Sequence, residues 1–185
     1  MSEPLPALTS LSDEETAFAE ALSSFFKEQV GPHVSRMDQE QQLELSLLPM
    51  FFEMGLMGIE VPEAMGGAGG NFFLSILVIE EAAIVDPAVS VLIDVQNTLV
   101  INAIRRWGSE EQQGRFLPRL AKDTVGAYAL SESSSGSDAF ALRCRAEQDG
   151  DDWVLNGNKL WITNANEAGL FLVFANTNLD LGYKG

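Results

Sequence analysis

The chain has 185 residues, of which 46% are hydrophobic, and a mean hydropathy of +0.05, so one domain or one and a half can pack a core. Its net charge of −16 at pH 7, from 27 acidic against 11 basic residues, argues against nucleic acid or an anionic membrane as a partner. One cysteine, Cys144, and one histidine, His33, exclude a disulfide framework and a Cys-rich or His-based metal site built from this chain alone.

Targeting and membrane segments are not evident in the sequence. Apolar runs all fall short of about 18 residues, so no bilayer span is expected. The first residues, Met-Ser-Glu-Pro, contain neither a signal-peptide core nor an arginine-rich transit segment. Taken alone, they indicate a cytosolic protein or one from which a targeting piece has been removed.

Helical patterns begin close to the N-terminus. A capping box of Ser12 and Glu15 starts an amphipathic helix that is expected to end at Gly31-Pro32. Residues 43–54 form a second helical stretch, and residues 59–61 are expected to be extended because they precede a proline.

The glycine-rich run 66–70 invites comparison with a phosphate-binding loop. Phe72 stands where the third glycine of a dinucleotide fingerprint belongs, and no Gly-Lys-Ser/Thr follows. A turn between helices is therefore the prediction. Residues 72–85 are apolar on most faces, which is typical of a buried helix.

Two further helices are predicted before residue 122. Asp86-Pro87 supplies the N-cap and first residue of one, in which Gln96-Asn97 marks a kink or a buried polar contact, or is plain helix interior. Ser109 and Gln112 form a second capping box, and Gly114 and Pro118 are expected to keep its helix short.

Strand patterns replace helical ones after Asp123. Residues 1–122 are thus predicted as an all-α domain and residues 123–185 as part of an antiparallel β domain, which gives an α+β fold. Bare edges of such a sheet favour aggregation, so we expect a fragment or a sheet covered by another chain. The predicted strands are 125–130, 144–148, 153–155, 159–163 and 170–175, with turns at Asp149-Gly150 and Asn156-Gly157.

The chemistry of the chain is concentrated between residues 128 and 163. A short apolar strand leads into a loop of hydroxyls, a glycine and backbone N–H groups, which suit a phosphate or the polar edge of a ring. Trp161 and Thr163 are expected to offer a flat surface and a hydroxyl on one strand. An ordinary β-turn and an ordinary core tryptophan are the alternative for either segment alone.

Together these segments resemble the acyl-CoA dehydrogenase family. The resemblance rests on the run Ala129-Leu130-Ser131-Glu132-x-x-Ser135-Gly136-Ser137-Asp138 followed by Trp161-Ile162-Thr163. Further stretches look most like the short/branched-chain members: residues 55–59, 96–99, 169–173 and 182–185. One departure is Ser133-Ser134-Ser135, where the family usually has Pro-Gly-Ala or similar.

The resemblance implies a helical domain, a middle β domain and a C-terminal helical bundle, with flavin adenine dinucleotide (FAD) held between them. Ser131 and the backbone of Leu130 would meet the polar edge of the flavin ring, and Trp161 and Thr163 the ring itself. The FAD contacts that it implies are Tyr128, Ala129, Leu130, Ser131, Gly136, Ser137, Trp161, Ile162 and Thr163. For the acyl-CoA substrate it implies contacts with Ser137 and Tyr183.

The activity implied is α,β-dehydrogenation of a short or branched-chain acyl-CoA by a homo-oligomer in the mitochondrial matrix, with electron-transfer flavoprotein as acceptor. In the family the catalytic glutamate lies in the C-terminal bundle, which this chain lacks, so no catalytic residue is assigned and the 185 residues alone are expected to be inactive. Two alternatives remain: a truncated, non-catalytic flavin-binding or interaction module, and a biosynthetic relative acting on a carrier-bound acyl group.

Overall fold

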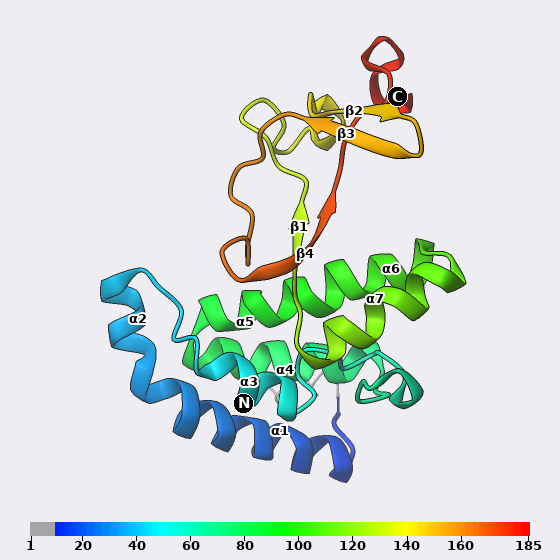
Figure 1. Ribbon diagram of the computed structural model, residues 1–185. Helices are drawn as coiled ribbons and strands as arrows, with labels where there is room; N and C mark the ends of the chain where they lie inside the picture. Colours follow the sequence, from blue (N-terminus) through cyan, green and yellow to red (C-terminus); the bar gives the residue numbers. More distant parts are fainter. Residues whose placement is uncertain (1–9) are drawn as a thin grey trace, which may run out of the picture.

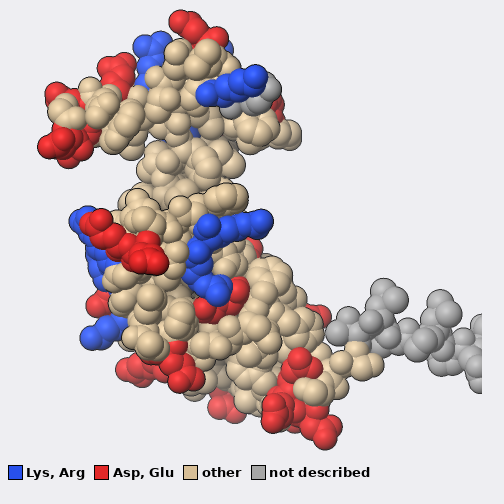
Figure 2. All heavy atoms as spheres, turned by 90° about the vertical axis from the view of Figure 1, so that its right-hand side faces the viewer, with Lys and Arg blue, Asp and Glu red and all other residues tan. Residues whose placement is uncertain are grey.

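A helical body carries a smaller β lobe, which stands on it through two parallel strands (Figure 1). The structure, a computed structural model, describes residues 10–185 apart from the side chain of Tyr183. Figure 2 shows a narrow neck, largely free of charged side chains on this face, between the body and the lobe. The α+β class predicted from the sequence is confirmed.

The first helical segment is longer than predicted. The capping box is present: Ser12 Oγ accepts from Glu15 N at 3.2 Å, and Glu15 Oε2 accepts from Ser12 N at 2.7 Å. The predicted end at Gly31-Pro32 is wrong, because Pro32 lies in the first turn of a 3-10 helix. Backbone N–H groups in a first turn have no acceptor within the helix, so the N–H group that proline lacks is not needed there. The chain leaves the helix only at Gln41, whose φ is +52°. The successive segments are α1 (Asp13–Phe25), the π-helix η1 (Phe26–Val30), the 3-10 helix η2 (Gly31–His33) and α2 (Val34–Glu40).

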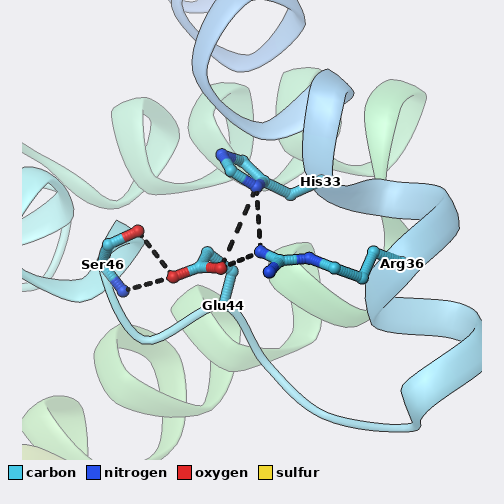
Figure 3. Close-up of polar contacts among 4 residues, drawn as sticks. All are labelled: His33, Arg36, Glu44 and Ser46. Atoms are coloured by element: carbon cyan, nitrogen blue, oxygen red, sulfur yellow. Dashed lines mark hydrogen bonds and ion pairs between the residues drawn. The ribbon is translucent and has the colours of Figure 1, made fainter.

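A polar cluster fixes the turn between α2 and α3 (Leu47–Glu53) (Figure 3). Glu44 accepts hydrogen bonds from the hydroxyl of Ser46 at 2.7 Å and from its amide at 3.1 Å, and it pairs with Arg36. His33 Nδ1 lies 4.0 Å from the same carboxylate. The hydrogen bonds from Ser46, assisted by Arg36, lower the pKa of Glu44 to about 2.

Replacement of Ser46 by alanine is expected to move the pKa of Glu44 from about 2 towards 4.5, because the hydroxyl is the largest of its causes. A carboxyl group whose pKa is lowered by folding stabilises the folded state at any pH above its pKa in the unfolded chain. This contribution is lost as the pH falls from 4.5 towards 2. Side-chain carboxyl NMR titration measures the shift. Ser35→Ala, a serine of the neighbouring helix α2 that makes no bond to Glu44, serves as the control. A wild-type Glu44 that titrates near 4.5 contradicts the prediction.

The glycine-rich run forms a connection between helices, as predicted, and it folds back on the residues after α3. Amides of this run bond to neighbouring carbonyls: Ala68 N to Gly58 O at 3.0 Å, and Gly70 N to Ile59 O at 2.8 Å. These amides are therefore not available to a phosphate. The expected extended piece at residues 59–61 is instead a series of turns, leading into the 3-10 helix η3 (Glu63–Met65).

The central helices follow the prediction more closely. The buried helix α4 (Phe72–Val85) has the expected bounds, and Asp86 caps α5 (Pro87–Asp94) by accepting from Val89 N at 2.8 Å. The last helix is longer than expected and passes both Gly114 and Pro118, because its capping box and buried apolar face outweigh their low helix propensity. After α5 come the π-helix η4 (Val95–Ile101), α6 (Asn102–Trp107) and α7 (Glu110–Lys122).

The continuous segment Pro87–Trp107 bears on the expectation that no part of the chain spans a bilayer. By length and composition alone this helix could cross a bilayer, and more than half of it is buried in the structure. Core helices of soluble proteins have the same length and composition, so this one helix is weak evidence for a membrane span.

Buried amides occupy the π-helical part of that segment. Gln96 donates to the carbonyls of Leu120 at 2.8 Å and Thr124 at 3.1 Å, and it accepts from Gly126 N at 2.6 Å. Asn97 donates to the carbonyls of Leu56 and Ile93 at 2.8 and 3.0 Å. Of the readings that the sequence left open, the buried polar contact is therefore correct.

The β lobe differs from the expected antiparallel sheet in one pairing. β1 (Val125–Ala129) pairs in parallel with β4 (Ala168–Val173), while β2 (Arg145–Asp149) and β3 (Asp152–Asn156) form the predicted hairpin around Gly150. A crossover separates β1 from β4, and hydropathy alternation alone does not fix strand direction. The predicted strand at 159–163 is irregular chain. Short 3-10 turns complete the lobe: η5 (Ala139–Ala141) and η6 (Leu179–Lys184).

Two apolar clusters hold the body together. One lies between α1, α3, α4 and α5 around Phe26, Phe51 and Ile93, all fully buried. The other lies between η4 and α7 around Ile101 and Leu120, and it extends up to partly buried residues of β1 and β4. The β lobe is thus seated on the second cluster.

Candidate functional site

The loop after β1 is a tight turn with an exposed far side. Glu132 and Ser135 exchange backbone hydrogen bonds of 3.0 and 3.1 Å, and Ser135 Oγ donates to Asp138 O at 2.8 Å. Gly136 and Ser137 follow on the surface. Within the described part of the chain, their amides have no hydrogen-bond acceptor, and a Cβ at Gly136 would meet no atom within 4 Å. These two amides are free to bind a ligand.

A buried ion pair anchors this loop. Lys159 Nζ lies 2.6 Å from Glu132 Oε1, and their side chains are only 11% and 5% exposed. The same carboxylate accepts from the amides of Arg143 at 2.6 Å and Cys144 at 3.0 Å. Burial acts to raise the pKa of Glu132, but the bonds from Lys159 and from the two amides outweigh it and leave the pKa lowered.

Lys159 also brings the second predicted segment to the loop. Its ammonium donates to Leu130 O at 3.0 Å, and Leu160 N donates to Ser131 O at 2.9 Å. Ser131 and Leu130 are half-buried at this junction. The serine-rich loop and the chain just before Trp161 are therefore held together as one unit.

Trp161 stands free on the surface instead of lying in a strand. Its side chain is 94% exposed and its φ is +57°, in the left-handed region that favours glycine. The expectation that Trp161 and Thr163 share a strand is wrong, because residues 163–167 form turns. An exposed tryptophan held in an uncommon backbone conformation leaves an indole surface open to a partner.

Thr163 faces the helical body. It lines a cavity of about 390 Å³ together with Asn164 and Glu167, and the opposite wall comes from α2, the following turn and α5. Ile162 is half-buried beside it. The hydroxyl of Thr163 thus lies in a cavity with both apolar and polar walls. The lining residues contributed by the helical body include Met37, Gln41, Leu43, Ala88, Val89 and Leu92.

Tyr128 and Ala129, the first residues assigned to the site along the chain, lie deeper in the protein than the serine loop. Ala129 is buried, and the half-buried ring of Tyr128 packs on Phe174 with centroids 4.9 Å apart. Loss of hydration raises the pKa of the Tyr128 phenol. Tyr183 belongs to η6, but its side chain lies outside the described residues, so its assignment to substrate stays a prediction.

Sequence reasoning missed the residues that hold the site together. Glu132 was noted only as part of the family motif, and Lys159 and Asn164 were given no role. A signal existed, because Lys159 and Glu132 carry opposite charges and lie in the two segments assigned to one ligand. Charged side chains in such places are paired when buried.

These residues fit FAD. Two exposed, unbonded amides suit phosphate oxygens, the exposed indole suits the face of a ring, and Thr163 offers a hydroxyl inside a cavity. The junction of Ser131 and Leu160 joins these features in one part of the lobe.

Comparison with known proteins identifies the family of both parts of the chain. Residues 12–124 match the acyl-CoA dehydrogenase N-terminal domain, and residues 127–185 match the acyl-CoA dehydrogenase middle domain.

Among curated relatives, a probable short/branched chain specific acyl-CoA dehydrogenase of Dictyostelium discoideum is 53% identical over 179 residues, which cover 96% of this chain and 43% of the relative. The mitochondrial short/branched chain specific enzyme of Bos taurus is 45% identical over 182 residues, 98% of this chain and 42% of that protein.

Among solved structures, a glutaryl-CoA dehydrogenase of Mycobacterium smegmatis in complex with FADH2 superposes with a TM-score of 0.85 at 35% identity, covering 91% of this chain and 44% of that one. The chain thus spans less than half the length of each of these relatives. The family matches over both parts of the chain establish that it belongs to the acyl-CoA dehydrogenase family.

Proposed function

We propose that this chain supplies the flavin-binding part of an FAD-dependent acyl-CoA dehydrogenase, which introduces an α,β double bond into a short or branched-chain acyl-CoA. Residues 1–122 would serve as the helical domain and residues 123–185 as the first part of the middle β domain. The observation that carries the proposal is the Glu132–Lys159 pair, which joins the open amides of the serine loop to the chain bearing Trp161.

Each proposed contact has its own chemical basis. The amides of Gly136 and Ser137 bind phosphate oxygens, and Ser137 also borders the acyl-CoA. Ser131 and the backbone of Leu130 meet the polar edge of the ring, while Trp161 packs on its face. Tyr128, Ala129 and Ile162 complete the FAD contacts through the strand and loop that carry them, and Tyr183 contacts the substrate.

FAD, when bound, would supply the capacity to take up a hydride, and the protein would orient its ring and tune its charge. Thr163 would donate a hydrogen bond towards the ring and stabilise negative charge there. Glu132 is no candidate for the base that removes the α-proton, because Lys159 and two amides already occupy its carboxylate. We assign no catalytic base within these 185 residues.

The relatives support the remaining parts of the proposal. The short/branched chain specific dehydrogenases among the similar proteins support short/branched-chain specificity, and the mitochondrial enzyme of Bos taurus supports a mitochondrial location, which we place in the matrix. Electron-transfer flavoprotein as the acceptor and a homo-oligomeric state complete the proposed setting. Turnover of 2-methylbutanoyl-, isobutanoyl- and straight-chain thioesters by a complete polypeptide, in which this chain is joined to the remaining length of its relatives, is the direct assay of substrate class. A folded complete polypeptide that binds FAD but turns over none of them supports the non-catalytic flavin-binding module instead.

Trp161 gives a test of flavin binding that does not depend on turnover. Trp107→Phe combined with Trp153→Phe leaves Trp161 as the only tryptophan, and added FAD is expected to quench its fluorescence. Trp161→Ala is expected to weaken FAD affinity by about tenfold, since aromatic packing on a ring contributes about 1 kcal/mol or more. Stability should stay unchanged because the side chain is 94% exposed.

Trp107→Ala is the matched control, because Trp107 is also exposed, at 79%, and stacks with Arg106 away from the serine loop. It should leave FAD affinity unaltered. A folded wild-type protein without flavin absorbance after incubation with FAD would refute the proposed function.

A further inference from the structure

Two side-chain amides hold the peptide groups of Gly126 from opposite directions. Gln96 Oε1, from the π-helix η4, accepts from Gly126 N at 2.6 Å. Asn164 Nδ2, from the turn after Trp161, donates to Gly126 O at 3.1 Å. Both side chains are buried, with Gln96 at 0% and Asn164 at 8% exposure. We call this arrangement the Gly126 clamp.

The clamp requires glycine at its centre. A Cβ at residue 126 would stand 2.8 Å from Val100 Cγ1 and 3.2 Å from Leu120 Cδ2. The backbone of β1 is therefore pressed directly on the helical body at this point. Any side chain tied to Gly126 is thereby tied to the body as well.

Asn164 makes a second contact with the body. Its Nδ2 also donates to Leu92 O on α5 at 3.1 Å, so one amide group joins a helix and a strand to the turn. The backbone of Asn164 has a φ of +68°, in the left-handed region that asparagine tolerates better than most residues. This conformation accompanies an inward-pointing, buried side chain.

Residues 161–167 depend on this side chain for their position. Their backbone hydrogen bonds are local, Ala165 N to Ile162 O and Glu167 N to Asn164 O. Outside the β1–β4 ladder, and within the described part of the chain, the hydrogen bonds from this segment to another element come from Asn164 Nδ2. Thr163, its neighbour, lines the same 390 Å³ cavity as Leu92.

We propose that Asn164 is a positioning residue for the flavin: through Gly126 and Leu92 it sets the placement of Thr163 and Trp161 against the helical body. The inference rests on the proposed function, because its ligand is FAD. It adds that the helical domain controls the geometry of the ring-binding segment by way of one buried amide.

Asn164→Asp tests the inference. The aspartate side chain has the same size as asparagine, but an oxygen replaces the Nδ2 donor and faces the carbonyls of Leu92 and Gly126. Asn97→Asp is the matched control, since Asn97 also donates to two buried backbone carbonyls, one of them on α5, without touching residues 161–167. Both variants should lose stability to a similar extent. The readouts are FAD affinity, the visible circular dichroism of bound flavin, and hydrogen exchange of residues 161–167 without FAD.

For Asn164→Asp we expect FAD affinity to fall about tenfold or more, the flavin signal to change, and exchange of 161–167 to accelerate. Asn97→Asp should keep wild-type values in all three. Equal FAD affinity and equal exchange in the two variants overturn the inference. If Asn164→Asp fails to fold, Asn164→Gly keeps the left-handed backbone and removes the amide, with the same expectation.

Failure of the proposed function has a different signature. If the folded wild-type protein binds no FAD, the proposed function is wrong. The hydrogen-exchange measurement on residues 161–167 still shows, in that case, whether Asn164 positions the segment. Wild-type binding combined with unchanged binding in both Asn164 variants removes the positioning role alone.

Discussion

Replacement of Lys159 by methionine is expected to destabilise the β lobe by about 3–5 kcal/mol, because it leaves the buried carboxylate of Glu132 without its cation. Methionine preserves the apolar stem and removes only the charge and the bonds to Leu130 and Glu132. FAD affinity should fall with it, since the serine loop and the Trp161 segment lose their common anchor. Urea unfolding monitored by circular dichroism, together with FAD titration, measures both effects.

Two variants make this expectation specific. Lys122→Met removes an exposed lysine at the end of α7 and should change stability by no more than about 0.5 kcal/mol. Glu132→Gln added to Lys159→Met should recover part of the loss, because no charge stays buried and the amide oxygen still accepts from one of the two backbone amides, of Arg143 and Cys144, that bond to the carboxylate. Loss of less than about 1 kcal/mol in the single variant at neutral pH would show that the pair is not the anchor.

The same pair has a pH signature. The pKa of Glu132 is lowered in the folded protein, so its contribution to stability is present above the ordinary glutamate value of 4.5 and is lost as the pH falls through the lowered pKa. In Lys159→Met the effect of burial is no longer outweighed by the ammonium, so the pKa of Glu132 should rise. The stability difference between wild type and variant should therefore shrink as the pH is lowered.

Gln96→Leu is expected to cost about 3 kcal/mol or more, because three buried backbone groups lose their partners at once. These groups are the carbonyls of Leu120 and Thr124 and the amide of Gly126. Leucine has a similar volume and cannot satisfy any of them. Thermal and denaturant unfolding give the magnitude, and hydrogen exchange at Gly126 reports the local effect.

Gln39→Leu is the control for a glutamine on a helix surface, since Gln39 is exposed and, among residues 10–185, its side chain bonds to Ser35 alone. It should be close to neutral. A Gln96→Leu protein as stable as wild type would mean that water or a repacked neighbour satisfies the three groups.

Local signals predicted helix starts well and helix ends poorly. The capping boxes at Ser12 and Ser109 and the Asp86-Pro87 start depend on residues within one turn, and all three are present. Pro32 and Pro118 were read as breaks, yet one falls in a first helical turn and the other is carried by a helix with a buried face. Whether a proline ends a helix thus depends on packing that a local pattern does not contain.

The sheet illustrates the same limit. Turn residues at Asp149-Gly150 identified the β2–β3 hairpin, because a two-residue turn fixes both register and direction. Strands β1 and β4 have no shared turn, so their parallel pairing depends on the path of the whole intervening chain.

For the site, the sequence indicated the segments but not their connections. The serine loop and the Trp161 motif were recognised, and the structure brings them together at Ser131 and Leu160. The side chains that hold them act across 27 residues between Glu132 and Lys159, and across 72 between Leu92 and Asn164. Contacts at such separations leave no periodic trace, which is why these residues were not singled out. The left-handed backbone of Trp161 was likewise invisible in its sequence.

Parallel pairing of β1 with β4 has a consequence for the order of folding. The chain between them must run out, form the β2–β3 hairpin and return before the pair can close, and closing so long a loop is slow compared with forming helices. The helical body, rich in local contacts, is therefore expected to form first and to provide the surface on which the strands meet. Both FAD-assigned segments lie inside this loop, so they would reach their native positions in the same late step, and competence to bind FAD would appear only when folding is complete.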